Sequence, residues 1–265
     1  MSCRDSPIRS HKLLKNMWER GTMRINVIGY GTVGKAQAFL LQKLNHEVFI
    51  FDPYLFPSVK SPEKNVDMTF VCTPDDVVTE IVQNLVNEHV EGLYVIKSTT
   101  IVGTTEDLMK KFGIHIAHNP EFLRENSAKE DVTNPDRIII GQCCAEHGEK
   151  LRSLYSPMGK PIFITDPTTS EAAKILSNSY LAVLITFWNE ANELAKKLGL
   201  DINEVAELVR ADSRVSAYGT TKFGEPFGGK CLPPNLDQLI DAFHNQGLNP
   251  LLFEAVKKYN QRLSK

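Results

Sequence analysis

The residues best suited to covalent chemistry lie in the second half of the chain. Cys231 stands in the segment PFGGKCLPP, where Gly228 and Gly229 keep side chains away and let a ligand approach the backbone. Lys174 and Asn178 are four residues apart, so on a helix both project from one face. A cysteine thiolate is a nucleophile, and a lysine ammonium stabilises a developing oxyanion. Taken alone, these residues also fit a structural cysteine and a surface lysine with a polar neighbour.

A second group of residues is suited to binding a dinucleotide. Gly29, Gly31 and Gly34 form the pattern GxGxxG in VIGYGTVG, directly after a strand pattern and at the start of a helix pattern. Such glycines permit a tight turn, a close approach of a pyrophosphate to the backbone, and close packing of helix on strand. The structural alternative is a strand-to-helix turn without a ligand. The expected cofactor contacts are Gly29, Gly31, Thr32, Val33 and Gly34.

The cofactor is expected to be NAD rather than NADP. Asp52 ends the second strand pattern, about 20 residues after the glycines, where a carboxylate binds the ribose hydroxyls of NAD and repels a 2′-phosphate. Thr73 and Pro74 follow the third strand pattern, at the edge of the sheet where ligands bind. A Thr-Pro helix start also explains this pair without a ligand.

The elements that must position these residues are predicted by hydrophobic periodicity. Short β-branched segments alternate with helical stretches from Met23 to Asp166, which predicts an α/β Rossmann fold with a doubly wound parallel sheet over residues 23–166. The predicted strands are RINVI, EVFIFD, DMTFVC, LYVIK, IHIAH, DRIIIG and IFITD.

The remainder of the chain is predicted to be helical. Residues 167–265 begin with one long helix that ends at Gly199, continue with a helix capped by Asp201, and finish with two helices after a Gly-rich loop at 212–230. Apolar residues surround the long helix on nearly every side, which predicts burial in a homodimer. Residues 1–22 form a separate N-terminal extension with the pattern of a short amphipathic helix.

Composition excludes several classes of protein. A net charge of -2 with mixed signs gives no reason to expect a nucleic acid partner, and no apolar run approaches the roughly 18 residues of a membrane span. The five cysteines are odd in number and have no CxxC spacing, which argues against a disulfide scaffold and a zinc site. We therefore expect a cytoplasmic protein without a metal.

Six motifs, in order, resemble the UDP-glucose and GDP-mannose 6-dehydrogenases, and the resemblance runs from Arg24 almost to the C-terminus. They are VIGYGTVG, KSTTIVGT, NPEFLREN, NPDRIIIG, EAAKILSNSYLA with FWNE, and FGGKCLPP. The resemblance implies NAD-dependent oxidation of a nucleotide sugar to the uronic acid, through a thiohemiacetal and a thioester on a cysteine.

The motif matches also imply residue roles. Cys231 corresponds to the nucleophile, Lys174 to the oxyanion-stabilising charge, and Asn178 to an amide that holds the same oxygen or a water. The family's water-handling and acid-base groups correspond to Thr99, Glu121 and Glu125.

Three features depart from the family pattern. The family has an aspartate four residues after its cysteine, and Asn235 stands there, which cannot exchange a proton at neutral pH. If that carboxylate is needed, turnover falls by about 10²- to 10⁴-fold. A short linker joins Asp52 to Val66, where the family has a longer excursion. The chain stops at Lys265, before the family's third, nucleotide-holding domain, so the pocket is expected to be incomplete.

Two alternatives to a nucleotide-sugar dehydrogenase stay open. A simple hydroxyacid dehydrogenase shares the Rossmann and helical domains and the Lys–Asn pair, although its chemistry needs no thioester. A non-catalytic NAD-binding paralogue or partner subunit is favoured by Asn235 and by the expected lack of a third domain.

Overall fold

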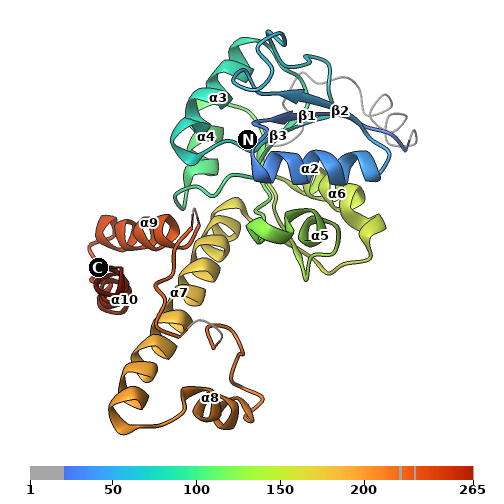
Figure 1. Ribbon diagram of the computed structural model, residues 1–265. Helices are drawn as coiled ribbons and strands as arrows, with labels where there is room; N and C mark the ends of the chain where they lie inside the picture. The colour runs from blue at the N-terminus through green and yellow to red at the C-terminus, as the bar shows by residue number, and fades with distance from the viewer. Residues whose placement is uncertain (1–20, 221–222, 230, 265) are drawn as a thin grey trace. The chain divides into compact units, whose positions relative to one another are not determined.

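The computed structural model describes residues 21–220, 223–229 and 231–264, which form two compact units (Figure 1). The first unit ends at Ala172 and the second begins at Ala173. The amphipathic helix expected within residues 1–22 falls almost entirely outside the described residues. No helix in the described part of the chain is long and apolar enough to cross a membrane.

The first unit is built on a seven-stranded sheet in the order β2-β1-β3-β4-β5-β6-β7. Its strands are β1 (Arg24–Ile28), β2 (Glu47–Phe51), β3 (Met68–Val71), β4 (Leu93–Ile96), β5 (Ile116–His118), β6 (Ile138–Gly141) and β7 (Ile162–Thr165). The seven predicted strands and the α/β Rossmann fold are thus confirmed.

The sheet is parallel only in part. Strands β1 to β5 are parallel, whereas β6 runs antiparallel to β5 and pairs with it through His118 and Gly141. Strand β7 is parallel to β6. The chain between β5 and β6 carries only the single turn η1 (Glu125–Ser127) and the short helix α5 (Ala128–Thr133). Strand β6 therefore runs in the opposite direction to β5.

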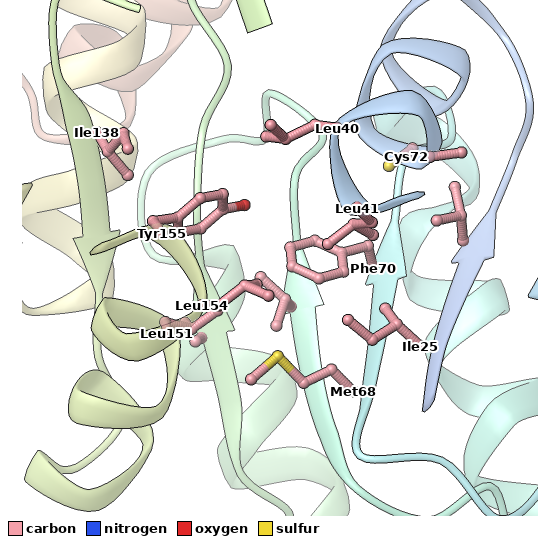
Figure 2. Packing of buried hydrophobic residues seen from close by; sticks show 14 of the residues in the cluster. Ile25, Leu40, Leu41, Met68, Phe70, Cys72, Ile138, Leu151, Leu154 and Tyr155 are labelled. Carbon is pink, nitrogen blue, oxygen red and sulfur yellow. The ribbon is translucent and has the colours of Figure 1, made fainter. Parts of the chain in front are cut away.

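Helices cover both faces of the sheet (Figure 1). On one face, α2 (Thr32–Lys43) and α6 (Ala145–Tyr155) bury Leu41 and Leu154 against Phe70 of β3 (Figure 2). On the other, α3 (Asp75–Asn87) and α4 (Thr104–Phe112) bury Val82 and Leu108. The turn η2 (Ser156–Met158) follows α6. Because alternate strand residues point to opposite faces, one sheet supplies both cores.

The strand order places a topological switch at β1. Helix α2 carries the chain from β1 to β2 on one side, and residues 52–67 return it across β1 to β3 without a helix or strand. The Asn26 side chain fixes this linker by donating to the Glu63 carbonyl at 2.7 Å. Ligands of open α/β sheets bind at the carboxyl edge next to such a switch, where Gly29 lies.

The second unit is helical, as predicted. Helix α7 (Pro167–Leu198) begins in the first unit and is followed by α8 (Ile202–Arg210), α9 (Leu232–Asn245) and α10 (Leu251–Leu263). Helix α9 begins at Leu232, earlier than its apolar pattern indicates, because Pro233 and Pro234 are tolerated in a first helical turn. Ala182 of α7 packs with Leu236 and Ile240 of α9 and Val256 of α10.

Candidate active site

The glycine loop between β1 and α2 has the geometry that its sequence predicts. Gly29 has φ +84°, and a Cβ there would lie 3.0 Å from the Cys72 carbonyl oxygen and 3.0 Å from Thr73 Cγ2. A Cβ on Gly34 would collide with the Gly29 carbonyl. Both positions therefore require glycine for the fold itself.

Gly31 differs from these two glycines, because a Cβ there would meet nothing within 4 Å. It is the N-cap of α2 and supplies no side chain to bind the helix's first amides. The first turn, which contains Thr32 and Val33, carries no acidic residue. Unsatisfied amides and the positive end of the helix dipole favour an anion such as a pyrophosphate. The open space at Gly31 admits that anion.

Asp52 follows β2 and faces the glycine loop. Its carboxylate accepts a hydrogen bond from the Tyr30 amide at 2.8 Å, and from the Tyr54 and Leu55 amides at 3.1 Å each. The side chain is only half-buried, so it stays accessible to a ligand that lies along the loop. This is the placement expected of a carboxylate that binds ribose hydroxyls.

Thr73 and Pro74 follow β3 on the other side of the switch. Pro74 is the N-cap residue of α3, and the Thr73 carbonyl accepts from Ser98 Oγ at 2.5 Å. Thr73 Oγ1 is buried and has no hydrogen-bond partner among the described residues. Buried hydroxyls are normally paired, so this atom fits a site completed by a ligand. Together with Gly31 and Asp52 it makes the carboxyl edge suitable for NAD.

The segment KSTT follows β4, and its first residue belongs to a buried polar network. Lys97, 5% exposed, donates through Nζ to Asn119 Oδ1 at 2.9 Å. The Tyr155 hydroxyl donates to the same oxygen at 2.6 Å and lies 3.2 Å from Gln37 Nε2. Thr99, two residues after Lys97, is half-buried. The sequence motifs contain Lys97 and Asn119, but no role was expected for them.

Glu171 is a third residue whose role the sequence did not indicate. It is 1% exposed, and its carboxylate accepts from the Gly103 amide at 2.6 Å and the Thr105 amide at 2.8 Å. Thr100 Oγ1 donates to it at 3.2 Å. Glu171 thus caps α4 and positions the loop that contains Thr99, while its burial raises the pKa of the carboxyl group.

The motif NPEFLREN forms the turn before α5. The Glu121 carboxylate accepts from the Leu123 amide at 2.5 Å. Arg124 forms an ion pair with Asp131 at 2.6 Å, and Ser127 Oγ donates to the same carboxylate at 2.9 Å. Glu125 is the first residue of η1. These contacts explain how the turn is held, and the acid-base roles of Glu121 and Glu125 remain predictions.

In the second unit, Lys174 and Asn178 lie one turn apart on α7, and both are buried, at 3% and 8% exposed. Asn178 Nδ2 donates to Asn235 Oδ1 at 2.5 Å. Asn235 in turn donates its backbone amide to the Cys231 carbonyl at 3.2 Å. The Cys231 thiol is exposed at the N-terminus of α9. The unit therefore connects Asn178 to the turn that begins at Cys231.

Comparison with known proteins shows the family. The model of the UDP-glucose/GDP-mannose dehydrogenase family's NAD binding domain matches residues 53–159, and that of its central domain matches residues 168–262. The UDP-glucose 6-dehydrogenase of Rickettsia typhi is 30% identical over 90% of this chain and 67% of the relative. This chain belongs to the UDP-glucose/GDP-mannose dehydrogenase family. It spans about half the length of two other relatives, 47% of the UDP-glucose 6-dehydrogenase of Rickettsia felis and 49% of that of Rickettsia conorii.

Solved structures of the family agree. The UDP-glucose dehydrogenase from Pyrobaculum islandicum superimposes with a TM-score of 0.81 and 28% identity, over 92% of this chain and 69% of that structure. A 3-hydroxyisobutyrate dehydrogenase from Mycobacterium tuberculosis superimposes with a TM-score of 0.75 and 18% identity, over 92% of this chain and 94% of that structure. At this identity the likeness shows a shared fold alone. The expected NAD cofactor is confirmed by the family's NAD binding domain.

Proposed function

We propose that this protein oxidises a nucleotide sugar of the UDP-glucose type to the corresponding uronic acid, with NAD as oxidant and Cys231 as covalent nucleophile. The observation that carries the proposal is the exposed Cys231 thiol at the start of α9, whose first turn is tied to the buried Asn178. Membership of the family and the NAD binding domain support the reaction class.

NAD, when bound, supplies the oxidising equivalents, two electrons in each of two rounds. Gly31, Thr32 and Val33 would hold its pyrophosphate, Asp52 its ribose, and Thr73 a polar group of the cofactor. The net conversion consumes one primary alcohol, two NAD and one water, and it yields one carboxylate, two NADH and three protons.

Cys231 carries the covalent steps. After the alcohol has become an aldehyde, the thiolate adds to the carbonyl carbon, a C–S bond forms, and the carbonyl oxygen becomes an alkoxide. Lys174 stabilises this oxyanion, and Asn178 holds the same oxygen or a water. Loss of two more electrons converts the thiohemiacetal into a thioester. Water then adds to the thioester carbon, the C–S bond breaks, and the thiolate leaves.

Three further residues assist proton and water transfer in the proposal. Thr99, Glu121 and Glu125 correspond to the family's water-handling and acid-base positions, and Glu171 positions the loop of Thr99. A carboxylate near the hydrolytic water takes its proton as the water attacks. We also propose that the protein is a cytoplasmic homodimer formed through α7, which exposes Leu176, Tyr180 and Phe187.

Stoichiometry tests the function. Purified protein is incubated with NAD and a panel of UDP- and GDP-sugars, NADH is followed by absorbance, and the acid is quantified by mass spectrometry. We expect two NADH per acid, and we expect Cys231→Ser to stop acid formation while NAD affinity is retained. One NADH per product would identify a simple hydroxyacid dehydrogenase. NAD binding without NADH production on any sugar would identify a non-catalytic NAD-binding protein.

A further inference from the structure

Between α8 and α9, the described residues form no helix or strand, and they lead to Cys231. Backbone groups in such a segment need hydrogen-bond partners from elsewhere in the fold. In residues 223–229, side chains of two neighbouring helices act as partners. Asn189 on α7 and Asn260 on α10 each bind the segment through both the oxygen and the nitrogen of the side-chain amide.

Asn260 pairs with both backbone groups of a single residue. Its Oδ1 accepts from the Phe227 amide at 2.8 Å, and its Nδ2 donates to the Phe227 carbonyl at 2.8 Å. The Phe227 ring is 6% exposed and packs in the core of the second unit with Leu236 of α9 and Val256 of α10. The backbone and the side chain of Phe227 are therefore both fixed.

Asn189 holds the start of the same segment. Its Oδ1 accepts from the Gly224 amide at 2.7 Å, and its Nδ2 donates to the Glu225 carbonyl at 2.7 Å. Asn189 is 2% exposed, and the ring of the adjacent Trp188 lies 6.2 Å from that of Phe223. An asparagine amide offers both donors and an acceptor, so one side chain can bridge a backbone N–H and a backbone carbonyl. An ionised aspartate only accepts and could not make both bonds.

The two glycines that follow this segment lie in open space. A Cβ on Gly228 or Gly229 would meet no atom of the described residues within 4 Å, and Gly229 has a φ of +80°. Glycine has more backbone freedom to lose than any other residue. The position of Cys231 therefore depends on how the chain is held before the glycines. After them, the Asn235 amide donates to the Cys231 carbonyl at 3.2 Å.

We propose that Asn189 and Asn260 are positioning residues that hold residues 224–227 and thereby set where the Cys231 thiol lies. The inference rests on the function proposed above, in which Cys231 is the nucleophile. Reacting atoms must lie about 3–3.5 Å apart before attack, and a misplacement of about 1 Å can lower the rate by about 100-fold. Both asparagines act on the thiol through the backbone of the segment.

Hydrogen–deuterium exchange of the full chain tests the hold on the segment without substrate or cofactor. Asn260→Ala should raise the exchange rate of the Phe227 amide by about tenfold or more, because that amide loses its acceptor, while α9 and α10 keep their protection. Gln261→Ala, an exposed amide next to Asn260, is the matched control and should change nothing. Unchanged exchange at Phe227 in Asn260→Ala overturns the proposal.

A milder variant covers the case in which alanine unfolds the second unit. Asn260→Asp keeps an acceptor for the Phe227 amide and loses only the donor to the Phe227 carbonyl. We expect it to raise exchange in residues 223–229 before it affects α9 or α10. Equal loss of protection throughout α9 and α10 in this variant would assign Asn260 a purely structural role and overturn the proposal.

Kinetics test whether the segment places the thiol. With NAD and a nucleotide sugar, Asn189→Ala and Asn260→Ala should each lower kcat for acid formation by about 100-fold. The KM for NAD should stay within about twofold, because the residues matched by the NAD binding domain lie in the first unit. A lower Tm with unchanged kcat would show that the asparagines only stabilise the fold, and it would overturn the proposal.

The failure of this proposal can be distinguished from failure of the proposed function. If the parent forms no acid from any sugar, the function fails, and the rate at which iodoacetamide modifies Cys231 replaces kcat as the measurement. A change of about threefold or more in Asn260→Ala, with Gln261→Ala unchanged, then supports the positioning role, since thiol reactivity depends on its surroundings. An unchanged rate overturns it.

Discussion

Asn178 on α7 donates its side-chain amide to Asn235 on α9 across 2.5 Å, and both residues are buried, at 8% and 5% exposed. Asn235 also donates through Nδ2 to Gln238 Oε1 at 3.2 Å. Asn235, where the family resemblance predicts an aspartate, is therefore held by hydrogen bonds inside the second unit. It joins the helix that carries Lys174 to the helix that begins after Cys231.

This pair predicts energetic coupling. Asn178→Ala leaves the buried Asn235 Oδ1 without its donor, and we expect a loss of about 1–3 kcal/mol in the free energy of unfolding. Asn235→Ala should be similar, and the double variant should lose less than the sum, by about 0.5–3 kcal/mol. Urea denaturation of the four proteins measures this. Asn203→Ala, an exposed amide on α8, is the control, and additive single effects would disprove the coupling.

The cysteines should differ sharply in reactivity. Burial raises the pKa of Cys72 to about 12 and that of Cys143 to about 11, so at pH 8 each is almost entirely thiol. Cys231 is exposed. We expect iodoacetamide to modify Cys231 at least about tenfold faster than the other two, as read by mass spectrometry of brief reactions. In denaturant the three rates should converge. Equal rates in the folded protein would contradict the placement of Cys231.

The turn NPEFLREN should respond to acid. Hydrogen bonds from the Arg124 side chain and backbone and from Ser127 lower the pKa of Asp131 to about 2. Since an unfolded aspartate titrates near 3.9, the stabilisation is fully present above about pH 5 and is lost as the pH falls through about 2. Asp131→Asn should reduce the free energy of unfolding by about 1 kcal/mol at pH 7, the upper part of the range for ion pairs at a protein surface, because the Arg124 side chain is 77% exposed.

Denaturation at several pH values tests this prediction. The difference between parent and Asp131→Asn should shrink steadily below about pH 5 and vanish only below about pH 1, under both pKa values. Asp107→Asn on α4, whose side chain is 82% exposed, should give almost no difference at any pH. A constant difference for Asp131→Asn down to pH 2 would mean that its effect is not ionic.

Sequence patterns predicted most of the fold because they depend on local periodicity. Alternating segments such as RINVI and DMTFVC produced strands β1 and β3, and the glycine pattern places Gly29 and Gly34 where a side chain would collide. The reversal of β6 was not predictable, because strand direction depends on the path of the connection and not on the strand's own residues. Likewise, the meeting of Asn260 with Phe227, and of Glu171 with Thr105, depends on tertiary packing.

Asp52 should determine the choice of cofactor. Its carboxylate faces the glycine loop through Tyr30, and a hydrogen bond from a ligand to a charged group contributes about 1.5–3 kcal/mol. We expect NAD to bind more tightly than NADP, and Asp52→Ala to narrow the ratio of the two Kd values by about tenfold or more. Isothermal titration calorimetry with both cofactors measures the ratio. Glu47→Ala, at the other end of β2, should leave it unchanged, and equal Kd values in the parent would refute the assignment.

The glycine loop allows cofactor binding to be separated from folding. Gly31 has an ordinary φ of -73°, and its Cβ would meet no atom within 4 Å, so Gly31→Ala should change the free energy of unfolding by less than about 0.5 kcal/mol. The same methyl group occupies the space in front of the α2 amides, so NAD affinity should fall by about tenfold or more.

Gly34→Ala is the matched comparison, because its Cβ collides with the Gly29 carbonyl. It should lower the Tm markedly whether or not NAD is present. Thermal unfolding with and without NAD, together with calorimetric titration, distinguishes the two variants. If Gly31→Ala binds NAD as well as the parent does, the pyrophosphate does not lie at this helix terminus.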